Sequence, residues 1–217
     1  MGLREGREIN LGEYLVFGRT QVFEHEPLPP HVNLRNLLVR LEDSIPQHYV
    51  GELDVIYIGN YDFLTRRDLN AMYENGAIYI LPDQDDEDDL YDDVIHEIAH
   101  CVEDTYGEYI YGDGEIEKEF LVKRKKLLDI LKREGYTCSL GDFLNVDYSK
   151  EFDEFLYIDV GYPKLQGLTM NLFVSPYGAT SLREYFANCF EEVYARENLQ
   201  LVKSLSPAAY KTISKIS

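Results

Sequence analysis

The chain has 217 residues, of which 45% are hydrophobic and 13% aromatic, and it carries a formal net charge of -19. This length and composition fit one folded domain, or one domain with two lobes, and exclude a disordered chain. A surface this negative repels phosphate backbones, so we expect no nucleic-acid partner. The same charge would attract basic peptides, although it also serves simply to keep a protein soluble.

The cysteines and the N-terminus bear on where the protein resides. Cys101, Cys138 and Cys189 are odd in number and form no CxxC pair, so we expect free thiols in a reducing compartment. Residues 1–10 are charged and lack the apolar stretch of a signal peptide. No apolar run approaches the length of a membrane span. We therefore expect an intracellular (cytoplasmic) or virion-associated protein without membrane contact.

The first half of the chain contains one helix pattern and two strand patterns. Leucines recur at helical spacing over residues 33–42, and Pro46 follows the end of this predicted helix. β-Branched and aromatic residues predict strands over 53–58 and 77–81. The remaining segments of this half are a proline-containing extended stretch over 20–31, a predicted helix over 65–74 and a turn at Asn75-Gly76.

Residues 83–89 form an acidic run between the second strand and the next helix. The run lacks the glycine and the final glutamate that a calcium-binding EF-hand loop needs at fixed positions. Carboxylates are favoured at helix N-termini by the helix dipole, so a solvated loop leading into a helix is the simpler interpretation. A second hypothesis places the run at one end of a substrate cleft, where it favours basic residues in the substrate.

Helix patterns dominate the second half of the chain. Apolar residues recur at helical spacing over 91–105, which is the clearest helix of the sequence. Opposite charges four residues apart indicate another helix over 115–133, and its basic run 123–126 is typical of a solvated face. We further predict strands over 152–160 and 168–174, a loop over 175–178, and a last helix that begins after Thr180 or Ser181 and ends near Arg196.

An HExxH motif, His96-Glu97-Ile98-Ala99-His100, lies inside the clearest helix. One helical turn separates the histidines, so both imidazoles leave the same face of the helix and reach one metal ion. Glu97 is rotated by about 100° from His96, which places its carboxylate near the metal without making it a ligand. There it can act as the general base that takes a proton from metal-bound water and passes it to the leaving amine.

A catalytic zinc site needs a third protein ligand. No histidine follows His100, so we expect a carboxylate. Glu184 on the last predicted helix is a candidate, but Ser181-x-x-Glu184 also fits a capping box, in which the glutamate only satisfies a backbone N–H group. Spacing alone does not decide between these two roles, and Glu191 and Glu192 stay open as further candidates.

The sequence resembles the catalytic domain of the anthrax lethal factor-like metallopeptidases, a group that includes the Pro-Pro endopeptidases. The resemblance is carried by His96-Glu97-x-x-His100-x-Val102-Glu103-Asp104 and, much later in the chain, by Glu184-Tyr185-Phe186-Ala187. It implies an α+β, zincin-like fold with a small mixed sheet, an active-site helix and a helical C-terminal lobe. It also implies a gluzincin site, in which His96, His100 and Glu184 hold one Zn²⁺ ion and Tyr177 donates a hydrogen bond to the oxyanion.

The resemblance also suggests how the rest of the chain is organised. It begins near residue 50, so we expect an N-terminal, helix-containing segment (1–50) that packs on a catalytic domain (51–217). Gluzincins often have a histidine-orienting carboxylate where this chain has Asn188, whose amide oxygen can accept the same hydrogen bond; Glu103 and Asp104 are alternative orienting groups. In such folds a strand edge pairs with an extended substrate, and the candidates here are Ala77, Ile78, Tyr79, Ile80 and Leu81.

These features predict a zinc-dependent endopeptidase that acts on a peptide or protein, with basic substrates favoured. The alternative is a zincin-fold protein with little turnover that serves as a binding or structural component, such as a virion or assembly part. The complete set of ligands, base and oxyanion donor favours the enzyme. The missing carboxylate at Asn188 is a mild argument for the alternative.

Overall fold

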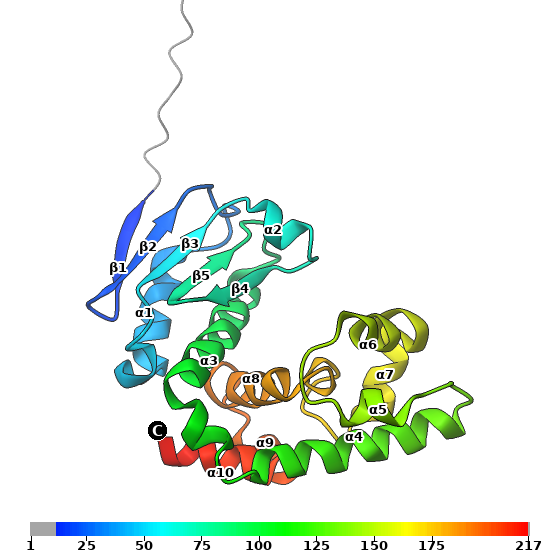
Figure 1. Cartoon of the computed structure of the whole chain (residues 1–217). Helices are drawn as coiled ribbons and strands as arrows, with labels where there is room; N and C mark the ends of the chain where they lie inside the picture. Colours follow the sequence, from blue (N-terminus) through cyan, green and yellow to red (C-terminus); the bar gives the residue numbers. More distant parts are fainter. Residues whose placement is uncertain (1–11, 217) are drawn as a thin grey trace, which may run out of the picture. The chain divides into compact units, whose positions relative to one another are not determined.

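The computed structural model describes residues 12–216, and the prediction about residues 1–10 lies outside this range. The chain forms two compact units, one ending at Val94 and the other beginning at Ile95. The division falls inside helix α3 (Glu87–Tyr111). The fold is α+β, with a small mixed sheet in the first unit and helices in the second (Figure 1). Within residues 12–216, no helix combines the length and the apolar character that crossing a bilayer requires.

The sheet of the first unit has five strands in the order β1-β2-β3-β5-β4 (Figure 1). These are β1 (Glu13–Val16), β2 (Thr20–Glu24), β3 (Val55–Ile58), β4 (Ala71–Glu74) and β5 (Ala77–Ile80). The two outer pairs, β1 with β2 and β4 with β5, are antiparallel, whereas β2, β3 and β5 run parallel. Ile56, Ile58, Ile78 and Ile80 are buried as opposite partners, which confirms the two predicted strands.

This sheet joins residues from both sides of position 50. β2 pairs with β3 in parallel, with Gln21 opposite Val55. The described part of the segment 1–50 therefore belongs to the same compact unit as residues 51–94. The expected boundary at residue 50 does not match this division, because pairing between strands far apart in the chain leaves no local signal in the sequence.

Strand β5 is internal, which contradicts the prediction that Ala77–Leu81 offers an open edge to a substrate. Its backbone pairs with β3 on one side and with β4 on the other. The helix predicted over 65–74 is also wrong, since only α2 (Asp62–Thr65) is helical there and β4 follows it. Asn75 and Gly76 have φ values of 49° and 81°, and this two-residue turn folds β4 back along β5. Both edges of β5 are therefore already paired within the sheet and offer no free backbone groups to a peptide.

Helix α1 (Leu34–Ser44) confirms the first predicted helix and is followed by a short 3₁₀ helix, η1 (Gln47–Val50). The side chain of Asn33 caps α1 by accepting a hydrogen bond from the Asn36 N–H at 3.2 Å. The predicted apolar stripe is buried and consists of Leu34, Leu37, Leu38 and Leu41. The leucine spacing thus gave both the helix and its buried face.

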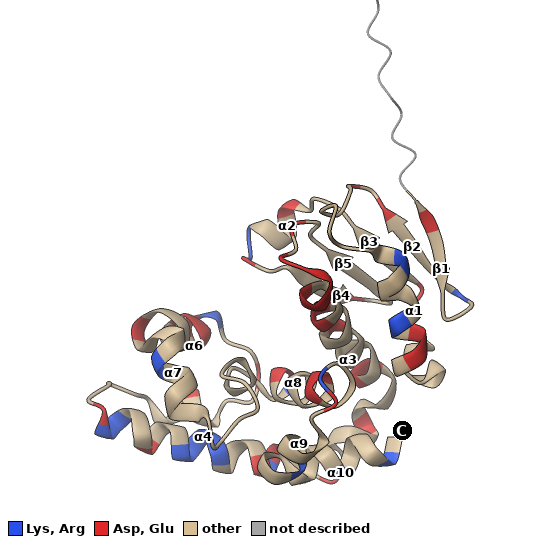
Figure 2. Ribbon diagram, turned by 180° about the vertical axis from the view of Figure 1, so that it is seen from behind, with Lys and Arg blue, Asp and Glu red and all other residues tan. Residues whose placement is uncertain are grey.

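The acidic run 83–89 leads into the N-terminus of α3, where Figure 2 shows acidic residues gathered in red. Asp86 accepts a hydrogen bond from the Asp89 N–H at 2.9 Å, and the Asp89 carboxylate accepts one from the Asp85 N–H at 3.3 Å. Arg40 of α1 forms an ion pair with Asp88. The run therefore caps and anchors the helix start, as the simpler interpretation expects.

The second unit consists of helical segments. After α3 come α4 (Glu115–Arg133), α5 (Leu140–Leu144), α6 (Lys150–Glu154), the π-helix η2 (Phe155–Gly161), α7 (Tyr162–Thr169), the 3₁₀ helix η3 (Tyr177–Ala179), α8 (Leu182–Tyr194), α9 (Leu199–Leu205) and α10 (Pro207–Ile216). The strands predicted over 152–160 and 168–174 are wrong. Phe152, Leu156 and Val160 are buried four residues apart, which is a helical period inside a short apolar run that also fits a strand.

Two cations of the basic run 123–126 are buried, which corrects the prediction of a solvated face for this part of α4. Lys123 donates hydrogen bonds from Nζ to the Tyr185 hydroxyl at 2.6 Å and to Ser206 Oγ at 2.9 Å. Burial lowers the pKa of Lys123 to about 8. Tyr185 in turn donates to Glu119 Oε1 at 2.8 Å, so the network connects α4 with α8 and with the start of α10.

Arg124, only 1% exposed, fastens two loops to α4. One guanidinium nitrogen donates to the carbonyls of Ala179 and Thr180 at 2.7 and 3.1 Å. The other donates to the carbonyls of Asp142 and Asn145. The segment before α8 and the segment after α5 are therefore held by the same side chain.

Replacing Arg124 by methionine leaves four carbonyls without their donor, and two of them, those of Ala179 and Thr180, are buried. Because an unsatisfied buried polar group costs about 1–3 kcal/mol, we expect the free energy of unfolding to fall by at least ~3 kcal/mol. Urea unfolding followed by circular dichroism measures this change. The matched control is Lys125→Met, an exposed neighbour on α4, which should cost less than about 0.5 kcal/mol. Similar losses in both variants would rule out the anchoring role of Arg124.

Candidate metal centre

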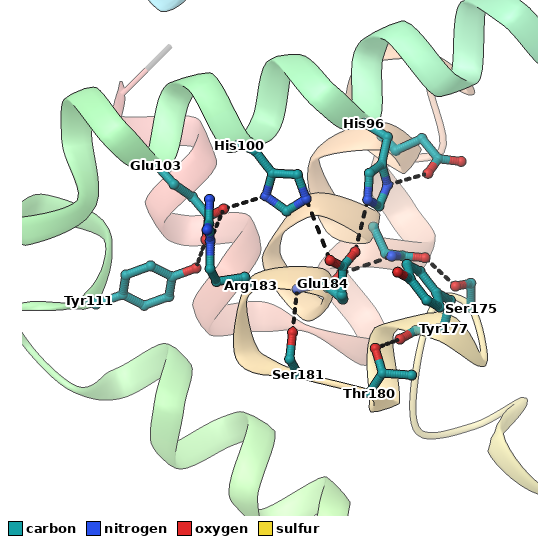
Figure 3. Close-up of polar contacts among 12 residues, drawn as sticks. His96, His100, Glu103, Tyr111, Ser175, Tyr177, Thr180, Ser181, Arg183 and Glu184 are labelled. Atoms are coloured by element: carbon teal, nitrogen blue, oxygen red, sulfur yellow. Dashed lines mark hydrogen bonds and ion pairs between the residues drawn. The ribbon is translucent and has the colours of Figure 1, made fainter. Parts of the chain in front are cut away.

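The two histidines of α3 face one carboxylate of α8 (Figure 3). His96 Nε2 lies 2.9 Å from Glu184 Oε2, and His100 Nε2 lies 3.6 Å from Glu184 Oε1. The imidazole rings are 5.2 Å apart, as expected for side chains separated by one helical turn. The side chains of all three residues are 12–15% exposed, so the cluster is mostly shielded from solvent.

Of the two hydrogen bonds of a capping box, the structure shows the one from the Glu184 backbone N–H to Ser181. Ser181 caps α8, since its Oγ accepts a hydrogen bond from the Glu184 N–H at 3.2 Å. The Glu184 carboxylate instead turns toward the histidines. The backbone of Glu184 thus completes the cap while its side chain is available to a metal.

His96, His100 and Glu184 form a group that can hold a metal ion. One ligand atom from each residue lies within 4.8 Å of the other two. Two imidazoles and one carboxylate are a frequent protein donor set for a catalytic divalent ion and leave a coordination position for water or substrate. The donor chemistry therefore fits a metal, and the structure brings together the three ligands that the sequence suggested.

Each histidine is oriented by a second carboxylate. His96 Nδ1 lies 3.2 Å from Glu191 Oε2, and His100 Nδ1 lies 2.6 Å from Glu103 Oε2. Each carboxylate has its own cation: Glu191 pairs with Arg196 at 2.9 Å and Glu103 with Arg183 at 3.1 Å. Because Nδ1 of each ring donates to a carboxylate, Nε2 is left as the metal-facing atom. Tyr111 also donates a hydrogen bond to Glu103.

Of the three predicted orienting residues, the structure places Glu103 alone against a histidine. Glu103 contacts His100 as expected, whereas Asp104 is exposed. Asn188 contacts neither ring: its Nδ2 donates to the Glu184 carbonyl at 2.8 Å, and its Oδ1 accepts from Ser175. Glu191 takes the role expected of Asn188. The sequence held a signal for this, because Glu191 follows Glu184 by two helical turns and lies on the same face of α8.

The two residues expected to take part in the chemistry lie beside the cluster. Glu97 is 8% exposed and follows His96 directly on α3. The Tyr177 ring lies 6.1 Å from the His96 ring and beside Glu184 (Figure 3). Thr180 fixes this turn by donating from both its N–H and its hydroxyl to the Tyr177 carbonyl. Burial, and then the negative charge of Glu184, raise the pKa of Tyr177, so its hydroxyl stays a hydrogen-bond donor.

Each ionisable group of the cluster shifts the pKa values of its neighbours. Burial opposes protonation of His96, but its hydrogen bonds to Glu184 and Glu191 outweigh this effect and raise its pKa well above the usual value. Burial likewise opposes protonation of His100, yet hydrogen bonds to Glu103 and Glu184 raise its pKa to about 9. Burial would raise the pKa of Glu184, but the hydrogen bonds from both histidines hold it well below its usual range. A divalent cation would replace the positive charge that these protons provide.

Comparisons of the chain with protein-family models, with curated proteins and with solved structures find no match. The functional assignment of this site therefore depends on its own geometry and chemistry.

Metal binding should depend on pH in a way that follows from His100. A metal ligand must be a neutral imidazole, and below pH 9 this histidine carries a proton that the ion has to displace. With Zn²⁺ as the probe ion, the apparent affinity should rise between about pH 7 and pH 8.5. For each proton that the ion displaces, the rise should be up to about tenfold per pH unit. Competition with a chelator of known affinity measures this rise. A plateau from about pH 7 upward would contradict the prediction.

The orienting role of Glu191 is testable with an isosteric change. Glu191→Gln keeps the size of the side chain but weakens its hydrogen bond to His96, so we expect a loss of metal affinity of about 10- to 100-fold. The matched control is Asp104→Asn, which removes an exposed carboxylate from α3 and should change the affinity by less than about twofold. Chelator competition at one pH compares both variants with the unchanged chain. Equal affinities for Glu191→Gln and the control would exclude this role.

Proposed function

We propose that the chain is a zinc-dependent endopeptidase with a zincin-like fold, in which a glutamate is the third metal ligand. The observation that carries the proposal is the convergence of His96, His100 and Glu184 from two helices. Zinc is favoured because two imidazoles and one carboxylate suit this ion and leave a coordination position open. A mostly shielded donor set with outer carboxylates is also what a tightly held ion requires.

A zinc ion held here would supply a Lewis acid for the substrate carbonyl and would lower the pKa of a water molecule. The residues of the chain then provide the proton transfers. Glu97 accepts a proton from the attacking water and delivers it to the leaving amine, for which its place beside His96 is suitable. Tyr177 keeps its proton and donates a hydrogen bond to the oxygen on which negative charge develops. The substrate is a peptide or protein, since the negative surface disfavours nucleic acids.

The alternative, a zincin-fold binding or structural protein with little turnover, loses its main support from the sequence. That support was the absence of a carboxylate at Asn188. Glu191 now supplies a carboxylate to His96 from the same helix, at 3.2 Å. A carboxylate that can orient His96 is therefore present, three residues after the position where the sequence suggested it.

The proposal is tested by changing Glu97 without disturbing the metal ligands. Glu97→Gln should lower kcat for peptide cleavage by about 10²- to 10⁴-fold, because an amide cannot accept the proton. Metal analysis should still find one zinc ion in each chain. The matched control is Glu108→Gln, an exposed change on the same helix, which should keep the activity of the unchanged chain.

The readouts are cleavage of a random peptide library by mass spectrometry and metal content by elemental analysis. Cleavage that persists in Glu97→Gln would remove this residue from the mechanism. A zinc-loaded chain that cleaves no member of the library would refute the endopeptidase and favour the binding or structural role. Iron in place of zinc in the purified protein would point to a different metal chemistry for the same three ligands.

A further inference from the structure

Asp153 on α6 differs from Glu103 and Glu191, the carboxylates that orient the histidines, because it lacks a cationic partner among residues 12–216. It is half-buried, and its Oδ2 accepts a hydrogen bond from the Tyr148 hydroxyl at 3.0 Å. Within residues 12–216 it forms no ion pair with a lysine, arginine or histidine. Glu103 and Glu191, by contrast, are each paired with an arginine. Partial burial weakens the solvation of a carboxylate, so Asp153 would gain from a cation that another molecule supplies.

Hydrogen bonds tie the Tyr148 segment to the helix start that carries Glu184. The Leu182 N–H donates to the Val146 carbonyl at 2.8 Å. Arg124 binds the Asn145 carbonyl on one side and the Thr180 carbonyl on the other. The segment that carries Tyr148 is therefore attached by hydrogen bonds to the first turn of α8. Asp153 is linked to this turn through its hydrogen bond with Tyr148.

The electrostatics agree with this placement. Burial raises the pKa of Asp153, the hydrogen bond from Tyr148 opposes that effect, and the negative charge of Glu184 adds to it. At Tyr177 burial is again the largest effect, followed by the charges of Glu184 and Asp153. Asp153 and Glu184 are therefore both close enough to Tyr177 for their charges to act on its hydroxyl.

Besides Tyr148, which donates to Asp153, a second tyrosine lies close enough for the charge of this carboxylate to act on it. Burial raises the pKa of Tyr162 to about 12, with the charges of Asp153 and then Glu184 contributing. The Tyr157 ring contacts the Tyr162 ring at 5.5 Å and is 55% exposed, and Tyr148 is 50% exposed. Tyrosine faces pack well against the aliphatic stem of a lysine or arginine and attract its cation.

We infer that Asp153, flanked by Tyr148 and Tyr162, is the subsite that receives a basic side chain, lysine or arginine, of a peptide substrate. This inference rests on the proposed peptidase function and adds a substrate class to it. The incoming cation would pair with a carboxylate whose hydrogen-bonding partner among the described residues is the neutral hydroxyl of Tyr148. The acidic run 83–89 is a poorer candidate for this role, because Asp86, Glu87, Asp88 and Asp89 already bind groups of the chain.

Two peptide libraries test the inference with the zinc-loaded full chain. They carry either lysine or norleucine at one position and are otherwise random, so they differ only by the ammonium group. The unchanged chain should show a kcat/KM on the order of 10- to 100-fold higher for the lysine library. Asp153→Asn should abolish this preference by slowing lysine peptides, while norleucine peptides keep their rate within about twofold. The matched control, Asp159→Asn, removes an exposed carboxylate from the adjacent π-helix and should keep the preference.

A binding measurement gives a readout that does not need turnover. Fluorescence anisotropy of lysine and norleucine peptides is recorded with Glu97→Gln, and again with the double variant Glu97→Gln and Asp153→Asn. The lysine peptide should bind more tightly only when Asp153 is present. Asp153→Arg should reverse the preference toward glutamate peptides, because the subsite then carries the opposite charge.

The outcomes separate the two proposals. Equal rates for both libraries, or a lysine preference that survives Asp153→Asn, would overturn the subsite and leave the peptidase function standing. A chain that cleaves neither library refutes the peptidase function, and the binding measurement then decides on Asp153 alone. Equal binding of lysine and norleucine peptides to Glu97→Gln overturns the subsite in that case.

Discussion

The contact of the Glu184 carboxylate with two imidazoles of α3 is the interaction on which the site depends. It unites residues far apart in the chain and places three ionisable groups in a mostly shielded position. Burying such groups is unfavourable unless their charges compensate one another. The raised pKa values of the histidines and the lowered pKa of the glutamate express this compensation. A divalent ion held here would meet the same need with fewer protons, so metal binding and protonation would compete for one site.

A second layer of carboxylates gives this contact its geometry. Glu103 and Glu191 occupy the Nδ1 side of each ring and are themselves held by arginines. Each ring is therefore fixed in orientation and in the identity of the nitrogen that faces the ligand position. Charges alternate outward from the cluster, from imidazole to carboxylate to guanidinium, so each of these groups has a neighbour of opposite charge. Asp153 differs from this pattern, because no cationic side chain of residues 12–216 pairs with it.

Helix α4 contributes to the site from a distance through its buried cations. Lys123 connects α4 with Tyr185 on α8, and Arg124 holds the carbonyls that precede α8. Both side chains have long aliphatic stems that pack in the interior; Lys123 places its donor on side-chain hydroxyls and Arg124 places its donors where loops end. Buried carbonyls at these loop ends would otherwise lack partners. The turn that carries Tyr177 is thus supported by hydrogen bonds and does not depend on apolar packing alone.

The sequence by itself determined the placement of His96, Glu97 and His100, because helical periodicity is local and puts the two histidines on one face. It also indicated α1, α3 and α8, whose apolar spacing extends over several turns, and α4, whose opposite charges lie four residues apart. It did not settle whether Glu184 caps its helix or faces a metal, since both roles satisfy the same local pattern. Tertiary structure turns the Glu184 carboxylate toward the two histidines, and it also decided the contact of Glu191 with His96 and the burial of Arg124. It also decided the internal position of β5 and the helical state of residues 152–160. These depend on which segments meet in space, and contacts between distant segments leave little trace in short-range spacing.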